Sequence, residues 1–394
     1  SAGAAGREHT VAQNRHTSAM RTSAGDGRSA EADPAVKMAD LERALLRKLS
    51  QRIAGSITSY SRRTPNADPR EKARDFLENL DWHLPEDLAE LGSAARAFPE
   101  LVSDSVAELL DESLDFVSAY LSICGHVLAS AGSRWLQQGR PRRKAEVLAG
   151  LLQRAMTATN ETFALLERGF PDGAEARMRT VVELGVIATF IERSSTEIAK
   201  RFEASHHVEM WRRKEDDHIR GLTAETIQII DKQYQRVIQR HGVSMARPYG
   251  WASPAFDNRR VTYADISRAY GNVVSSSRFS NASHRVHASH SGSMKSAAAD
   301  SVGVCLHGPR PVGFYMPAYE CMDSLHQSAT AFLRAVRSSR RNVELVYWTE
   351  LLHYTMKEAQ LQITHAQAVI DPEWARRSIA NLPELDIDGI FLKI

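Results

Sequence analysis

The sequence predicts an all-α protein: a multi-helix bundle with an N-terminal helical extension and a disordered N-terminal tail. Apolar residues recur every three or four positions through most of the 394-residue chain, which is the period of an amphipathic helix. No segment alternates apolar and polar residues for long enough to indicate a strand. The apolar fraction of 43% and the charged fraction of 25% are typical of soluble globular proteins.

Three regions follow one another along the chain. Residues 1–36 contain almost no large apolar side chains, so we expect a disordered tail, most simply a leader translated upstream of Met38. Residues 37–139 contain short helices separated by proline-containing breaks, and one longer apolar helix over about 115–136. A glycine- and proline-containing breaker then separates this N-terminal helical region from a C-terminal bundle over 140–394, which carries the candidate site.

Within the bundle, the apolar periodicity predicts a series of long helices. After a first helix that ends before Gly169, the expected helices span about 173–194, 197–217, 223–241, 318–339 and 342–369. The intervening segments 242–258 and 292–317 are rich in glycine, serine and proline, so we expect loops there.

Composition excludes several classes of protein. The net charge of +2 gives no global basic field for nucleic acid or an anionic membrane. Cys124, Cys305 and Cys321 lack the paired spacing of a zinc site, so we expect reduced thiols, a cytoplasmic location and no cofactor. The most apolar windows are short or interrupted by polar residues, so we expect no membrane span. No glycine-rich phosphate loop, nucleophile elbow or dinucleotide fingerprint is present.

The polar stretch over residues 278–290 is the main candidate functional site. It contains three histidines, two arginines and three serines in thirteen residues. On a helix, His284 and His287 would share one surface with Ser283. Imidazole, guanidinium and hydroxyl groups held together suit proton transfer near a phosphate. The predicted catalytic residues are Arg278, His284 and His287, and the predicted substrate-binding or supporting residues are Ser283 and Asn281.

Arg179 and Glu183 form a second candidate pair, one turn apart on a mostly apolar helix. An exposed pair at this spacing stabilises a helix by only about 0.5 kcal/mol or less. A buried pair needs partners and often marks a polar network. We predict that the two residues support the 278–290 stretch, with a purely structural pair as the alternative.

Two blocks of the sequence resemble a bacterial family of unknown function. The first block is Arg179-Thr180-Val181-Val182-Glu183-Leu184, followed by Ala199-Lys200-Arg201-Phe202. The second is Phe279-Ser280-Asn281-Ala282-Ser283-His284-Arg285-Val286-His287-Ala288-Ser289. In that family, one helix carries an arginine and a glutamate four residues apart, and a later helix carries an alanine-x-x-phenylalanine pattern. The second block begins with an aromatic residue and a serine and ends in valine-histidine-alanine-serine. The resemblance covers about residues 145–370.

That family is in turn similar to the HEPN helical domains, many of which are metal-independent ribonucleases. Their signature is an arginine four to six residues from a histidine, which Arg278 and His284 match. The resemblance therefore implies a ribonuclease of a defence or toxin system that acts on RNA as a homodimer and needs no metal. The family has a basic residue directly after its aromatic, whereas this chain has Ser280 there.

Other interpretations remain open. The same groove would also suit a catalytically inert helical module that binds a protein partner or a small ligand. His284, His287 and His290 form an H-x-x-H-x-x-H series, but on a helix the third would turn away from a metal bound by the first two. Arg201 and His206 have the same separation as many nuclease pairs, within a charged segment that we interpret as a solvated face.

Two basic clusters have two possible interpretations. Their cations would contact a nucleic-acid backbone, or they are solvated helix ends, where cations are favourable near the C-terminus. The clusters comprise Arg140, Arg142, Arg143 and Lys144, and Arg334, Arg337, Arg340 and Arg341.

Overall fold

The computed structural model describes residues 106–130, 143–214, 222–270, 313–336 and 343–370, together with residues 51 and 104. About 90% of the described residues are helical, and none of them forms a strand. The predicted all-α fold class is therefore confirmed. The predicted division at residues 139 and 140 stays a prediction.

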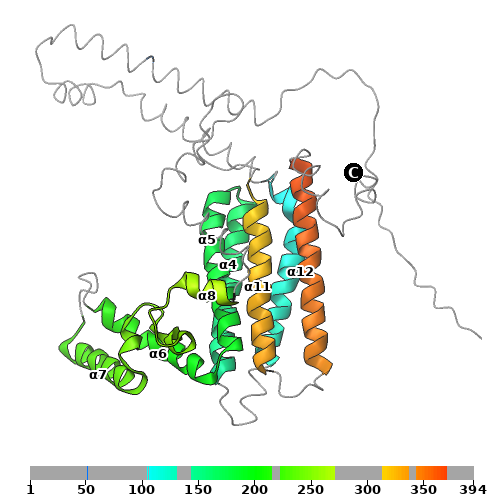
Figure 1. Ribbon diagram of the computed structural model, residues 1–394. Coiled ribbons are helices and arrows are strands. Elements are labelled where there is room, and N and C mark those ends of the chain that lie inside the picture. Colours follow the sequence, from blue (N-terminus) through cyan, green and yellow to red (C-terminus); the bar gives the residue numbers. More distant parts are fainter. Residues whose placement is uncertain are drawn as a thin grey trace, which may run out of the picture.

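Long helices packed side by side form the body of the protein (Figure 1). They are the helix Val106–Ser130, α4 (Arg143–Glu167), α5 (Pro171–Arg193), α11 (Tyr315–Val336) and α12 (Val343–Ile370). Helix α11 packs against α4, α5 and α12, and α4 also packs against α5. One continuous apolar core includes side chains from all five helices.

A glycine sets the distance between α5 and α11. A Cβ atom on Gly185 would lie 2.7 Å from the backbone oxygen of Ser324. Any larger residue would therefore push the two helix backbones apart. On α4, the expected apolar stripe is buried, including Leu148, Leu152 and Phe163. Burial of such side chains contributes about 1.5–3 kcal/mol each relative to exposure.

A smaller group of elements projects from one side of the long helices (Figure 1). Helices α6 (Thr196–Arg213) and α7 (Ala224–His241) pack against each other. Two 3-10 helices, η1 (Val243–Ala246) and η2 (Gly250–Phe256), follow, and η2 packs on α6. Helix α8 (Tyr263–Tyr270) then returns to α5.

Local sequence explains where these helices begin and end. The Thr223 hydroxyl accepts a hydrogen bond from the backbone N–H of Thr226 and caps the start of α7. Gly242, with φ +87°, ends α7, because most other residues avoid that conformation. Thr262 and Asp265 exchange side-chain and backbone hydrogen bonds at the start of α8, which is the arrangement of a capping box.

The structure differs from the sequence-based expectation at two places. Val106–Ser130 is one continuous helix, although we expected the longer apolar helix to begin at about residue 115. The buried face of the helix includes Ser113, which is only 1% exposed. Because serine is polar, it interrupts the apolar periodicity from which the helix would be predicted. The expected loop after Gly242 contains the 3-10 helices η1 and η2.

The helix Val106–Ser130 is long and apolar enough to cross a membrane, judged by length and composition alone. A core helix of a soluble protein passes the same test, so one such helix is weak evidence of a span. Its side chains Val117, Tyr120 and Cys124 pack in the core. The cytoplasmic location stays a prediction.

Candidate functional site

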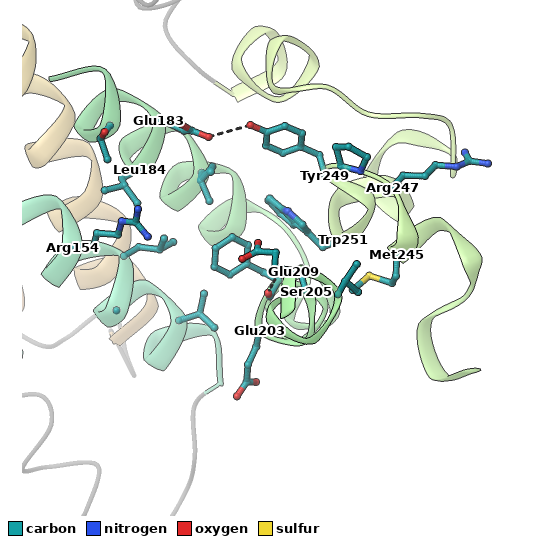
Figure 2. Close-up of a pocket in the computed structure, with 18 of the residues that line it drawn as sticks. Arg154, Glu183, Leu184, Glu203, Ser205, Glu209, Met245, Arg247, Tyr249 and Trp251 are labelled. Atoms are coloured by element: carbon teal, nitrogen blue, oxygen red, sulfur yellow. Dashed lines mark hydrogen bonds between the residues drawn. The ribbon is translucent and has the colours of Figure 1, made fainter. Parts of the chain in front are cut away.

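A pocket of about 570 Å³ lies where α4, α5 and α6 meet the turn that runs from Met245 to Trp251 (Figure 2). We call it the Glu183 pocket. Its apolar lining includes Leu151, Leu184, Ile187, Phe202, Val208 and Trp251. Its charged lining comprises Glu146, Arg154, Glu183, Glu203, Glu209, Arg212 and Arg247. The pocket therefore combines an apolar floor with charges of both signs.

Glu183 and Tyr249 join α5 to this turn. The Tyr249 hydroxyl donates a 3.0 Å hydrogen bond to Oε1 of Glu183 (Figure 2). Burial raises the pKa of Tyr249, and the nearby charge of Glu183 raises it further. The same two causes raise the pKa of Tyr263 on α8. Both phenols therefore stay protonated at neutral pH, and that of Tyr249 donates to the carboxylate.

Arg201 holds the turn in place from α6. Its side chain is 4% exposed, and burial lowers its pKa. Its guanidinium donates four hydrogen bonds, to the backbone oxygens of Trp251 (3.1 Å), His241 (2.6 Å) and Gly250 (3.0 Å) and to the hydroxyl of Ser244 (3.0 Å). These bonds offset the cost of burying the charge. We therefore assign Arg201 a positioning role.

The turn itself is tight. Tyr249 has φ +52°, in the left-handed region that non-glycine residues rarely occupy. A Cβ atom on Gly250 would lie 1.9 Å from the backbone oxygen of Ser244. Only glycine fits there. The left-handed residue directs the chain so that Tyr249 reaches Glu183.

Trp251 forms an aromatic wall of the pocket. It is 6% exposed, and its ring lies edge-on to Phe202 at 4.9 Å between centroids. The Phe190 ring packs at 5.5 Å from Trp251. Since packing restrains the indole on both sides, it offers a fixed apolar surface to a ligand.

Two charged side chains face each other across the pocket without a partner among the described residues. Arg154 extends from α4, and Glu209 extends from α6 toward it (Figure 2). The other charges are engaged or distant: Glu203 pairs with Arg143 at 3.0 Å, and Arg247 points outward from the turn (Figure 2). The pocket can therefore hold a ligand with one anionic and one cationic group. Within the described ranges, no three His, Cys, Asp or Glu side chains converge as a metal site requires.

The predicted site residues fall into two groups. Arg179 and Glu183 are half-buried on α5, and Glu183 lines the pocket. Whether they support the 278–290 stretch stays a prediction. The remaining predicted residues lie outside the described part of the chain: Arg278, Asn281, Ser283, His284 and His287.

The interpretation of the Arg201 segment as a solvated face was wrong at Arg201 itself. The guanidinium of Arg201 is hydrogen-bonded to the turn, so it is not available to act with the exposed side chain of His206. Sequence reasoning also missed Tyr249, Trp251 and the pair Arg154 and Glu209. The sequence does contain one indication of the turn: Gly250 lies between two aromatic residues, Tyr249 and Trp251, in a segment that we expected to be a loop.

The fold and the site define an all-α bundle with a ligand-sized pocket between three helices and a glycine-dependent turn. Residues 145–302 match the model of a family described as "Family of unknown function (DUF5677)". That match includes every residue of the Glu183 pocket. No curated protein and no solved structure shows a significant match to the chain.

Proposed function

We propose that the protein binds a small zwitterionic ligand with an apolar body in the Glu183 pocket. The observation that carries this proposal is the placement of Arg154 opposite Glu209 above an apolar floor, with neither charge paired among the described residues. The volume of about 570 Å³ is typical of small-molecule sites.

Each part of such a ligand has a matching group in the pocket. A carboxylate or similar anion accepts two parallel hydrogen bonds from the Arg154 guanidinium. An ammonium group pairs with Glu209 or with the free oxygen of Glu183. The apolar body lies against Trp251 and Phe202, where burial from water supplies most of the affinity. The charges at the rim fix orientation and specificity.

Calorimetric titration with phenylalanine and two blocked analogues tests this proposal. Phenethylamine lacks the carboxylate, and N-acetylphenylalanine lacks the cationic amine. We expect the zwitterion to bind and each analogue to bind at least about tenfold more weakly, because a hydrogen bond to a charged group contributes about 1.5–3 kcal/mol. Equal affinities for all three compounds would contradict the proposed roles of the charges.

A matched pair of variants locates the binding. Gly150 lines the pocket, and a Cβ atom there meets nothing within 4 Å, so the side chain of Gly150→Phe has room to begin and its ring would occupy pocket space. Gln153 is exposed on the same helix and does not line the pocket, so Gln153→Phe is the control. We expect Gly150→Phe to abolish binding and Gln153→Phe to preserve it.

A second candidate function, a HEPN-like metal-independent ribonuclease, rests on the separation of Arg278 and His284 in the sequence. One described feature supports it. Helix α8 packs against α5, which carries Arg179 and Glu183, and Arg278 follows the end of α8 by eight residues. An extended chain of that length reaches at most about 29 Å. The covalent chain therefore tethers Arg278 to a helix that packs against α5.

In this candidate function, a histidine takes a proton from an RNA 2′-hydroxyl and Arg278 stabilises charge on the attacked phosphate. Two such sites meet in a homodimer. We expect His284→Ala and His287→Ala to lose RNA cleavage. His206→Ala, which removes the exposed histidine of the other Arg–His pair, is the control. No cleavage of any RNA by the wild-type dimer would exclude the ribonuclease.

A further inference from the structure

A second hollow, of about 420 Å³, lies between α6 and α7. We call it the α6–α7 groove. Four of its lining side chains are permanently cationic and one is a carboxylate. The cations are Arg143, Lys200, Arg236 and Arg240, and the carboxylate is Glu203. Glu203 also lines the Glu183 pocket, so the two hollows adjoin at that residue.

The cationic charge is unbalanced on the α7 side of the groove. Arg143 pairs with Glu203 at 3.0 Å, and Lys200 lies 3.9 Å from Glu197. Arg236 and Arg240 are exposed, one turn apart, and neither has an acceptor among the described residues. Like charges at this spacing destabilise a helix by about 0.2–0.5 kcal/mol. An anion bound between them would remove that repulsion.

A buried nitrogen in the same groove also lacks a partner. Nδ1 of His207, which lines the groove from α6, is buried and has no hydrogen-bond partner in the part of the chain that the structure describes. A buried polar atom left without a partner is unfavourable. A ligand oxygen that reaches this atom would accept a hydrogen bond from it in the tautomer that carries hydrogen on Nδ1.

Helix-end electrostatics do not account for this cluster. Cations are favourable in the last turn of a helix, which suits Arg240 at the end of α7. Arg143, however, is the first residue of α4, and Lys200 is the fifth residue of α6. The positive end of a helix dipole disfavours a cation at Arg143, and the dipole has little effect at Lys200, which lies beyond the first turn. Three helices therefore place cations around one hollow, and helix-end electrostatics favour only the cation at Arg240.

We propose that the α6–α7 groove binds the phosphate group of a small phosphorylated ligand, with Arg236 and Arg240 as its principal contacts. Arginine presents a planar fork of donors that matches phosphate oxygens. Among the described residues, no Phe, Tyr or Trp side chain lines the groove, and its apolar lining is limited to Ala204 and Val237. The lining is therefore dominated by charged donors, which favours recognition of phosphate over recognition of a nucleic-acid base. This site is additional to the zwitterion pocket.

Calorimetric titration of the full chain with inorganic pyrophosphate tests the proposal. We expect wild-type protein to bind pyrophosphate, and we expect Arg236→Gln and Arg240→Gln each to weaken binding about tenfold, the effect of one lost charge-assisted contact. Lys232 is exposed on α7 outside the groove, so Lys232→Gln removes the same charge without the contact. Because Lys232 makes no contact in the groove, Lys232→Gln should weaken binding clearly less than Arg236→Gln does.

The outcomes separate this proposal from its competitors. A loss in Lys232→Gln equal to that in Arg236→Gln would show a diffuse field and overturn the site, as would no pyrophosphate binding by wild-type protein. A single-stranded RNA oligonucleotide that binds through Arg236 and is not displaced by pyrophosphate would also overturn it, in favour of a nucleic-acid backbone. Gly150→Phe, which fills the neighbouring pocket, should leave pyrophosphate binding unchanged.

Discussion

Nε of Arg201 donates a 3.1 Å hydrogen bond to the backbone oxygen of Trp251, fifty residues further along the chain. The other nitrogens of the guanidinium bind three more oxygens, at the end of α7 and in the turn that follows it. One buried cation thus organises the backbone that presents Tyr249 and Trp251 to the Glu183 pocket. The geometry of the pocket depends on a residue that does not line it.

Replacing Arg201 with methionine should strongly destabilise the protein. The variant leaves four oxygen acceptors without their donor. Two of the lost hydrogen bonds, those to the backbone oxygens of Trp251 and Gly250, are buried. We expect the free energy of unfolding, measured with urea and circular dichroism, to fall by about 3 kcal/mol. Arg213→Met, at an exposed position of the same helix, should change it by less than about 0.5 kcal/mol. Similar losses in both variants would refute the positioning role.

Two glycines should respond in opposite directions to the same substitution. In Gly250→Ala, the new methyl group would meet the Ser244 oxygen at 1.9 Å, so the turn must move, and we expect a loss of at least about 2 kcal/mol. In Gly150→Ala, nothing lies within 4 Å, and an exposed helical glycine costs about 0.5–1 kcal/mol relative to alanine. Gly150→Ala should therefore raise the melting temperature while Gly250→Ala lowers it. A neutral Gly250→Ala variant would contradict the close approach.

The contact between Glu183 and Tyr249 should appear as a coupling energy. Tyr249→Phe removes the hydrogen bond and Glu183→Gln removes the charge of its acceptor, and we expect a double-mutant cycle on unfolding free energy to give about 1 kcal/mol. Tyr234 stacks on Trp211, and its hydroxyl has no hydrogen bond among the described residues, so Tyr234→Phe is the control. It should be additive with Glu183→Gln. Additivity of Tyr249→Phe would rule out the contact.

Helix positions were predictable because apolar periodicity and end signals act locally. The stripe through Leu148, Leu152 and Phe163 predicted α4, and Gly169 with Pro171 marked the break before α5. Gly242 likewise marked the end of α7. These signals need no knowledge of distant contacts, which is why they are readable from a single sequence.

The pocket was less predictable because its determinants are distant contacts. An arginine in a charged segment is usually solvated, and Arg201 is buried only because backbone oxygens 40 to 50 residues away converge on it. Arg154 and Glu209 belong to different helices, so their opposition depends on how α4 and α6 pack. Glu183 was predictable because it lies one turn from Arg179 in a block that resembles a known family, whereas Tyr249 belongs to no such block.

A half-buried histidine in the long-helix bundle provides a further test, at acid pH. The Tyr120 hydroxyl and Nδ1 of His326 are hydrogen-bonded at 2.9 Å, and the ring of His353 lies 5.5 Å from that of His326. Burial, together with smaller electrostatic contributions from His353, Lys357 and Arg334, lowers the pKa of His326 to about 4. His326 is therefore neutral in the folded protein at physiological pH.

Protonation of His326 should destabilise the fold as the pH falls. Because its pKa is lower in the folded state than the value of 6.5 expected when unfolded, its contribution is fully present above pH 6.5 and is lost as the pH falls toward about 4. We expect about 2–3 kcal/mol of the free energy of unfolding to disappear across that interval. His326→Gln, which keeps an acceptor for Tyr120, should flatten this dependence in urea titrations at successive pH values. His206→Gln, at an exposed position, should not. If His326→Gln loses stability with acid as steeply as the wild type and His206→Gln do, His326 is not the titrating group.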